Sequence, residues 1–252
     1  MLEELRQRLQ ALEKPAGIED RPGALPLGIA AVDAVLGGGL VCGALHEIAA
    51  PGEAHLTAAT GFVLGLAASK QTRVCWIAED MARLESGAPY GPGLDSFILA
   101  PERLLSVNVA HPRDLLWAME EALRCRAIGA VIGELRHVKI DAVAVRRLSL
   151  AAAETGALAL LLRAEPAHDA STAATRWIVG AAPSSFARSF ESNAPSFTAH
   201  LVRNRRGPTG SWILEWSDTD ERFVLATHSV PLAAPAFDRP HRKVVRKIAR
   251  VA

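Results

Sequence analysis

Residues 26–68, PLGIAAVDAVLGGGLVCGALHEIAAPGEAHLTAATGFVLGLAA, decide the fold of this chain. Apolar residues at helical spacing over 29–36 predict a short helix, and the three glycines at 37–39 allow a helix end and a tight reversal. A strand is expected over 44–49, and then a loop and a helix over 57–69 that is apolar enough to be buried between layers. Helix, glycine turn, strand, loop and helix follow one another as they do around the phosphate site of P-loop proteins.

The loop after this strand departs from the phosphate-binding pattern G-x-x-x-x-G-K-[ST]. In that pattern backbone N–H groups surround the phosphates, the lysine reaches the β- and γ-oxygens, and the hydroxyl binds Mg²⁺. Here Ala50 and His55 stand at the two glycine positions and Leu56 at the lysine, and only Thr57 agrees; a frame that starts at Gly52 fits no better. We therefore expect no nucleotide or other cofactor, no catalytic residue, and a Thr57 that caps the helix or lies in its first turn.

Other residues that could carry chemistry have a weaker basis. Gly133-Glu134 follows a later apolar strand, at the point where a P-loop ATPase has the Asp that holds Mg²⁺, so Glu134 stands one position late. Glu79 and Asp80 follow another strand, where related ATPases keep a water-activating carboxylate; without the lysine we interpret them as solvated residues. No G-x-S-x-G motif occurs, and an isolated histidine such as His46 is expected to be a surface or satisfied residue.

The composition of the 252 residues, 50% apolar and 22% charged, is that of a globular protein with one α/β domain or one domain and a small appendage. No apolar run reaches the roughly 18 residues that cross a bilayer, and the N-terminus lacks the apolar core of a signal peptide. A cytoplasmic protein without a membrane partner is expected. Cys42, Cys75 and Cys125 lack CxxC spacing and are expected to be buried thiols, and no cluster of metal-ligand spacing occurs.

The rest of the chain alternates strand and helix patterns. Strands are expected over 73–78, 103–109, 127–132 and 157–163, with helices over 111–124 and 141–155. Such repetition predicts a parallel, doubly wound sheet. Strands over 175–179, 195–202, 211–216 and 222–226 should add an antiparallel edge, with a hairpin at RNRRGPTG. Residues 86–96, with three glycines and two prolines, are expected to be an irregular surface loop.

The fold class is thus α/β, with a P-loop-type core, a mostly parallel sheet with helices on both faces, and an antiparallel edge hairpin. We expect an amphipathic helix and linker over 1–25, the core over 26–230 and a basic tail over 231–252. Residues 237–252 hold six Lys/Arg and one Asp (+5), whereas the other residues hold 22 Lys/Arg against 26 Asp/Glu (−4).

Three surfaces are candidates for partner binding. The helix expected over 2–14 carries leucines on one face, and it packs either on its own domain or on a neighbouring protein. The arginines of the hairpin and the basic tail suit an acidic protein surface or DNA backbone, and a tail that only improves solubility is the alternative. The candidate residues are Leu5, Leu9 and Leu12 in the helix, Arg203, Arg205 and Arg206 in the hairpin, and Arg242, Lys243, Arg246, Lys247 and Arg250 in the tail.

The segment LPLGIAAVDAVLGGGLVCGALHEI resembles the one through which RecA-type recombinases enter their ATP site. CWIAED then falls near the segment of their catalytic glutamate. RRLSLAAAETGALALLLR, TRWIVGAAPS and LVRNRRGPTGSWILEW look like the helix, strands and hairpin that complete a RecA-like core, so that the resemblance covers roughly residues 25–217.

Among RecA relatives the chain resembles most closely the ImuA family, accessory factors encoded with components of error-prone polymerases. The hairpin RNRRGPTG and the missing lysine favour this family. The resemblance implies a non-catalytic adaptor in DNA-damage-induced mutagenic translesion synthesis. The implied partners are an ImuB-like inactive Y-family polymerase, RecA and, indirectly, an error-prone replicative-type polymerase subunit; contact with DNA is expected to be weak.

The chain also departs from active RecA relatives. Ala50, His55, Leu56 and Gly133 remove the phosphate cradle and the metal-holding carboxylate, and the short segment 163–174, without lysine, does not favour recombinase-style DNA binding. Two alternatives remain open: a cell-division inhibitor similar to SulA, and a divergent RecA-like DNA-dependent ATPase.

Overall fold

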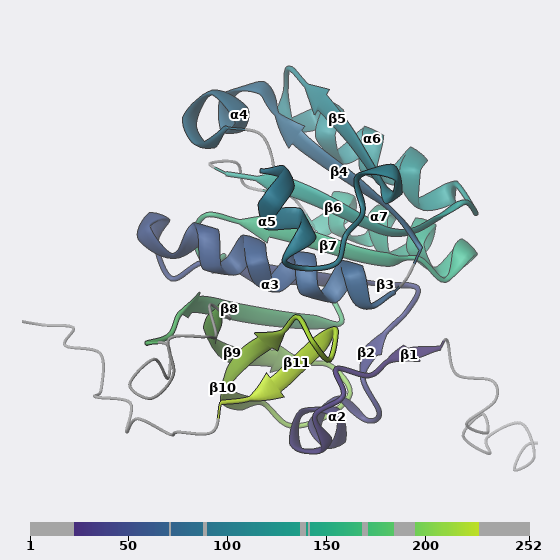
Figure 1. Ribbon diagram of the computed structural model, residues 1–252. Helices are drawn as coiled ribbons and strands as arrows, with labels where there is room; N and C mark the ends of the chain where they lie inside the picture. Colours follow the sequence, from purple (N-terminus) through teal and green to yellow (C-terminus); the bar gives the residue numbers. More distant parts are fainter. Residues whose placement is uncertain are drawn as a thin grey trace, which may run out of the picture.

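The computed structural model describes residues 23–70, 72–87, 90–136, 140, 142–167, 171–183 and 195–226. The amphipathic helix expected over 2–14 and the basic tail expected over 231–252 lie outside these ranges. Figure 1 shows the described part as one central sheet with helices on both faces.

The central sheet has nine strands in the order β11-β10-β9-β8-β3-β7-β6-β4-β5. The strands are β3 (Ala44–Ala49), β4 (Arg73–Glu79), β5 (Leu104–Val109), β6 (Ile128–Leu135), β7 (Leu158–Arg163), β8 (Thr175–Ala181), β9 (Ser196–Asn204), β10 (Gly210–Ser217) and β11 (Arg222–Leu225). Strands β3 to β8 pair in parallel, and β9, β10 and β11 add an antiparallel edge to β8. The expected mostly parallel sheet with an antiparallel hairpin is confirmed.

The helices are α2 (Ala30–Leu36), α3 (Leu56–Ser69), α4 (Asp80–Ser86), α5 (Gly91–Asp95), α6 (Pro112–Arg124) and α7 (Ala142–Thr155), with the short 3₁₀ helices η1 (Glu53–His55) and η2 (Pro101–Arg103). Helices α3 and α5 lie on one face of the sheet, and α6 and α7 on the other (Figure 1). Alternation along the strands produces this layering, because Leu160 and Leu162 of β7 join the core under α3 whereas Leu161 joins the core under α6 and α7.

The triple-glycine turn reverses the chain between α2 and the strands that follow. Helix α2 ends at Gly37, whose φ of 72° is left-handed, and the chain reverses into β2 (Leu40–Val41), which pairs with β1 (Ala24–Leu25). A Cβ on Gly39 (φ 134°) would lie 2.3 Å from the carbonyl oxygen of Leu25. Only glycine therefore fits this crossing of the chain.

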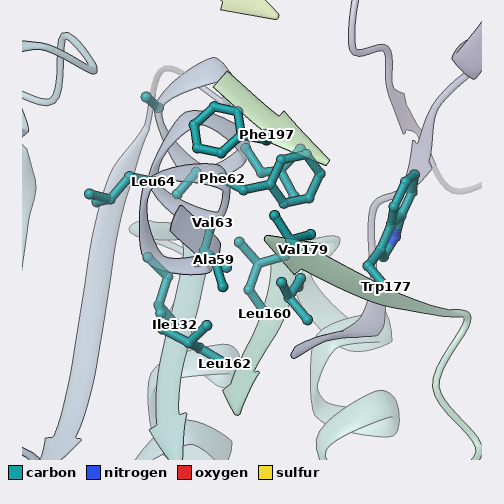
Figure 2. Close-up of a cluster of buried hydrophobic side chains, with 14 of the residues drawn as sticks. Ala59, Phe62, Val63, Leu64, Ile132, Leu160, Leu162, Trp177, Val179 and Phe197 are labelled. Carbon is teal, nitrogen blue, oxygen red and sulfur yellow. The ribbon is translucent and has the colours of Figure 1, made fainter. Parts of the chain in front are cut away.

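Helix α3 is buried along most of its length, as its composition predicted. Figure 2 shows Phe62 beside Phe197 of β9, with Val63 and Leu64 on the same helix. Glycines on α3 let the aromatic cluster approach closely, since a Cβ on Gly65 would lie 2.5 Å from the ring of Phe223. The helix thus joins the parallel sheet to the antiparallel edge.

Three expectations differ from the structure. Residues 86–96 are not wholly irregular: they include α5, because Leu94 is buried in the core under α3 and holds a helical turn there. Strand β8 pairs in parallel with β3, so the antiparallel edge begins one strand later than expected. Cys125 is exposed because it follows the last turn of α6, whereas Cys42 and Cys75 are buried.

Candidate functional site at the loop between β3 and α3

The loop between β3 and α3 is held in a turn by hydrogen bonds between its own backbone groups. It forms the 3₁₀ turn η1, in which the N–H of His55 donates to the carbonyl of Gly52 (2.9 Å) and the N–H of Leu56 to that of Glu53. These two N–H groups stand at the second-glycine and lysine positions of the phosphate-binding pattern. They are engaged within the loop rather than directed at a ligand.

The side chains of the loop strengthen this closure. The ring Nδ1 of His55 accepts a hydrogen bond from the N–H of Ala181 (3.1 Å), which ties the loop to the end of β8. Leu56 is buried in the core under α3, and Ala50 is completely buried. Thr57 is exposed in the first turn of α3, as the sequence predicted.

Strand β6 directs Glu134, not Gly133, to the face on which the loop lies. Ile132 belongs to the core under α3 and Val131 to the core under α6 and α7, so the alternation of the strand places Glu134 with Ile132. A Cβ on Gly133 would lie 2.2 Å from the sulfur of Met119, so any side chain there would force the side chain of Met119 to move. The late carboxylate identified in the sequence therefore faces the loop.

Glu134 is already paired. Arg136 donates to it through Nη2 (3.0 Å) and Nε (3.2 Å), and donates through Nη1 to Glu85 of α4 (3.3 Å). The side chain of Arg136 is only 5% exposed. Sequence reasoning missed Arg136 and Glu85, because they follow no motif; the available signal was the position of Arg136 directly after a buried strand.

A cavity of about 330 Å³ lies beside the loop. Its lining includes Leu56 and Thr57 of α3, Trp76 of β4, Glu134 of β6 and Phe97 after α5. Helices α3 and α5 border this space on the front face of the sheet in Figure 1. The structure thus brings Thr57 and Glu134 to one cavity. It does not place Glu79 or Asp80 in that lining.

The hairpin arginines differ in their surroundings. Arg203 donates to the carbonyl of Ser171, and Arg205 donates to that of Thr172 (3.0 Å), so both hold the segment before β8. The amide of Asn204 donates to the carbonyl of Val35 at the end of α2 (3.0 Å). Arg206 is exposed at the tip. The predicted partner surface therefore includes two arginines with a structural contact.

A buried charged pair lies below this segment, and its two residues belong to no sequence motif. Glu47 of β3 is 3% exposed, and its carboxylate accepts hydrogen bonds from Nε of Arg176 (2.8 Å) and from the hydroxyl of Ser171 (2.5 Å). Arg176 also donates to the carbonyl of Ala167 (3.0 Å). Lone charged residues inside apolar strands were the available signal, and only the pairing of β3 with β8 brings them together.

The remaining candidates lie outside the described residues. They are Leu5, Leu9, Leu12, Arg242, Lys243, Arg246, Lys247 and Arg250. Within the described ranges, no group of three or more His, Cys, Asp or Glu side chains could hold a metal ion. No helix among the same residues has the length and apolarity needed to span a membrane.

The fold and the loop define a RecA-like α/β protein. A solved structure, the crystal structure of the RadB recombinase, matches with a TM-score of 0.56 and 13% identity, over 79% of this chain and 98% of that chain. Proteins named ImuA from two strains of Caulobacter vibrioides, NA1000 / CB15N and ATCC 19089 / CIP 103742 / CB 15, are 29% identical over 223 residues, covering 78% of this chain and 87% of each relative. This similarity supports the resemblance to the ImuA family that the motifs indicated. No family model matches the chain.

Proposed function

We propose that this protein is a non-catalytic RecA-like adaptor in DNA-damage-induced mutagenic translesion synthesis. It binds an inactive, ImuB-like Y-family polymerase and RecA, and through the first of these it serves an error-prone replicative-type polymerase subunit. The similarity to proteins named ImuA and the RecA-like fold support this role. The state of the phosphate loop supports its non-catalytic character.

One observation carries the non-catalytic part of the proposal. The N–H groups of His55 and Leu56 donate to carbonyls of their own loop, and a buried leucine occupies the lysine position. A triphosphate needs free N–H groups and a positive charge at these positions. It would meet instead the exposed carboxylate of Glu53 and the carboxylate of Glu134, already paired with Arg136, in the lining of the neighbouring cavity. Like charges in a partly enclosed site repel, so nucleotide binding is disfavoured.

Calorimetric titration of the full chain with Mg²⁺–ATP tests this part. We expect no heat of binding at millimolar nucleotide, under conditions in which an active RecA-type ATPase gives a clear isotherm. The matched measurement uses Mg²⁺–ADP, because a site that lost only the γ-phosphate contacts would still bind the diphosphate. Micromolar affinity for either nucleotide would contradict the proposal and favour a divergent ATPase.

The adaptor role is tested by co-purification with the polymerase partner. Arg206→Glu is the clean variant of the hairpin, because Arg203 and Arg205 hold neighbouring backbone and their loss would also disturb the fold. Arg113→Glu on α6, with a side chain 84% exposed, is the matched surface control. We expect Arg206→Glu to weaken capture of the polymerase and Arg113→Glu to leave it unchanged.

A second comparison tests whether the C-terminal tail contributes to partner binding. Full-length protein and a chain truncated after Pro235 are tested for capture of the same polymerase and of RecA. We expect the truncated chain to lose at least one of these partners. Unchanged capture of both by the truncated chain would remove the tail from the interface, and failure of the full-length protein to capture either would overturn the adaptor role.

A further inference from the structure

One residue that lines the cavity beside the closed loop carries a buried hydrogen-bond donor. Trp76 lines the cavity and is 3% exposed, and its indole N–H has no hydrogen-bond partner among the described residues. The two other fully buried tryptophans differ, because Trp177 donates to Oγ1 of Thr175 and Trp216 to the carbonyl of Ser96, both at 2.9 Å. A buried donor without a partner destabilises its surroundings, so the packing around Trp76 is a place where the wall of the cavity can gain from rearrangement.

The charge around the cavity selects a cationic ligand. Glu53 and Glu134 line it, and Glu85 contacts the one lining cation, Arg136. Three carboxylates and one guanidinium leave a net charge of −2 (1 − 3). Glu53 is exposed and has no ion pair among the described residues. A Lys or Arg side chain at the mouth would therefore find an unpaired carboxylate.

The walls of the cavity select an apolar anchor. Leu64 of α3, together with Leu94 and Phe97 at α5, lines its inner side, and Tyr90 is 75% exposed near its rim. A volume of about 330 Å³ lies at the lower end of the range for ligand pockets, about 300–1,000 Å³. It accommodates the anchoring side chains of a peptide rather than a whole helix.

We propose that this cavity binds a basic peptide with aliphatic anchors, and that the occupant is the C-terminal segment 241–251 of the same chain, HRKVVRKIARV. Val244, Val245 and Ile248 supply apolar side chains among Lys and Arg residues. The charge of this segment is opposite to that of the cavity, and the rest of the chain offers no comparable cluster of basic and aliphatic residues in its sequence.

The chain outside the described residues is long enough to reach the cavity. The last described residue, Ala226, follows β11, whose Phe223 contacts α3 at Gly65. Gly65 lies one helical turn from Gly61, which lines the cavity. The residues between 226 and 241 span up to roughly 50 Å at about 3.3 Å per residue, more than the short path required. Attachment to the same chain also raises the effective concentration of the segment to the millimolar range.

If the tail binds the cavity of its own chain, the cavity and any partner protein compete for the tail. Any protein that binds the basic tail has first to displace it from the cavity, so the cavity would set the affinity of the tail for its partners. The inference concerns a site within one chain, and it stands or fails independently of the proposed adaptor role.

Zero-length cross-linking of the full chain with a water-soluble carbodiimide is the first test. We expect an amide between the carboxylate of Glu53 and the amine of Lys243 or Lys247, identified by mass spectrometry. A mixture of ¹⁵N-labelled and unlabelled protein separates the sources, because contact in cis gives no cross-linked peptides of mixed isotope. Mixed peptides would assign the cavity to the tail of a second copy and overturn the proposal, as would the absence of this cross-link.

The second test follows the indole resonance of Trp76 by NMR and needs no cross-link. Its indole ¹⁵N–¹H resonance is assigned with Trp76→Phe, and Trp117, 62% exposed on α6, provides the reference resonance in the same spectrum. Charge reversal of the tail, Lys243→Glu with Lys247→Glu, should shift the Trp76 signal and leave that of Trp117 in place. Glu53→Lys should do the same, and the combined charge swap should return the signal toward its original position. A Trp76 signal that none of these variants moves would overturn the proposal.

Discussion

Mild acid should destabilise the fold through one buried histidine. His46 of β3 is completely buried; its Nε2–H donates to the carbonyl of Val41 (2.9 Å), and its Nδ1 lies 2.7 Å from Oγ1 of Thr175. That oxygen accepts from the indole N–H of Trp177 (2.9 Å), so the hydroxyl is free to donate to Nδ1. The carbonyl can only accept, and the neutral ring therefore satisfies every member of the network. A second proton on Nδ1 would break it.

The magnitude follows from the pKa of His46. Burial lowers this pKa from 6.5 to about 4; the hydrogen bond to Val41 opposes the change, and the charge of Arg206 adds to it. Above pH 6.5 the ring is neutral in both the folded and the unfolded chain. As the pH falls from 6.5 toward 4, the unfolded chain binds a proton that the folded chain does not, so unfolding becomes easier. At about 1.36 kcal/mol per pH unit, the free energy of unfolding falls by about 3 kcal/mol.

Urea denaturation from pH 7 down to pH 4, with His46→Gln as the matched variant, measures this loss. The glutamine amide does not titrate, and it can still donate to Val41 and accept from Thr175. Carboxylates elsewhere titrate equally in both proteins, so their effects cancel in the difference between the two unfolding free energies. That difference should shift by about 3 kcal/mol against the histidine protein between pH 7 and pH 4. A difference that stays constant over this range would refute the argument.

Three further changes have expected outcomes. Arg176→Met leaves the carboxylate of Glu47 buried without its guanidinium, and should lower the free energy of unfolding by about 3–5 kcal/mol in chemical denaturation. Gly65→Ala should cost about 1–3 kcal/mol in spite of the better helix propensity of alanine, because the new Cβ would lie 2.5 Å from the ring of Phe223; the melting temperature reports the loss. Cys125 is the exposed thiol of the three, so a chromogenic disulfide at pH 8 should label this residue rapidly in the native protein.

Each of these changes has a control. Arg113→Met removes an exposed arginine and should change the stability by no more than about 0.5 kcal/mol, and a loss equal to that of Arg176→Met would contradict the buried-charge argument. Gly61→Ala places its Cβ at 3.0 Å from Phe97, a milder contact, and should cost less than Gly65→Ala. Burial raises the pKa of Cys75 to about 11, so rapid native labelling of this thiol would contradict its position in the core.

Much of the fold was predictable because local pattern encodes it. The strand expected over 44–49 is β3, with the same bounds, and the apolar helix expected over 57–69 begins one residue earlier as α3. Runs of apolar residues bounded by glycine, proline or charge have few alternative structures in a chain of this length. One error lies where local pattern and burial disagree: the composition of 86–96 predicts a loop, although Leu94 holds this stretch against the core as a short helix.

For the candidate site, the sequence predicted the substituted loop positions but not the contacts between distant residues. The substitutions at the phosphate-binding positions were visible in the sequence, since a motif is local. The sequence did not identify the pairing of Arg136 with Glu134 and Glu85, because these residues are separated by up to 51 positions. The partnerless indole of Trp76 was equally out of reach, since a missing hydrogen bond is a property of three-dimensional packing.

The sequence by itself determined the order of strands and helices and the absence of a lysine at position 56, because both are properties of neighbouring residues. Only the tertiary structure decided that the loop closes through its own N–H groups, that Glu134 faces it, and that a cavity opens beside Trp76. These features depend on which strands lie side by side, and parallel pairing joins segments that are far apart along the chain.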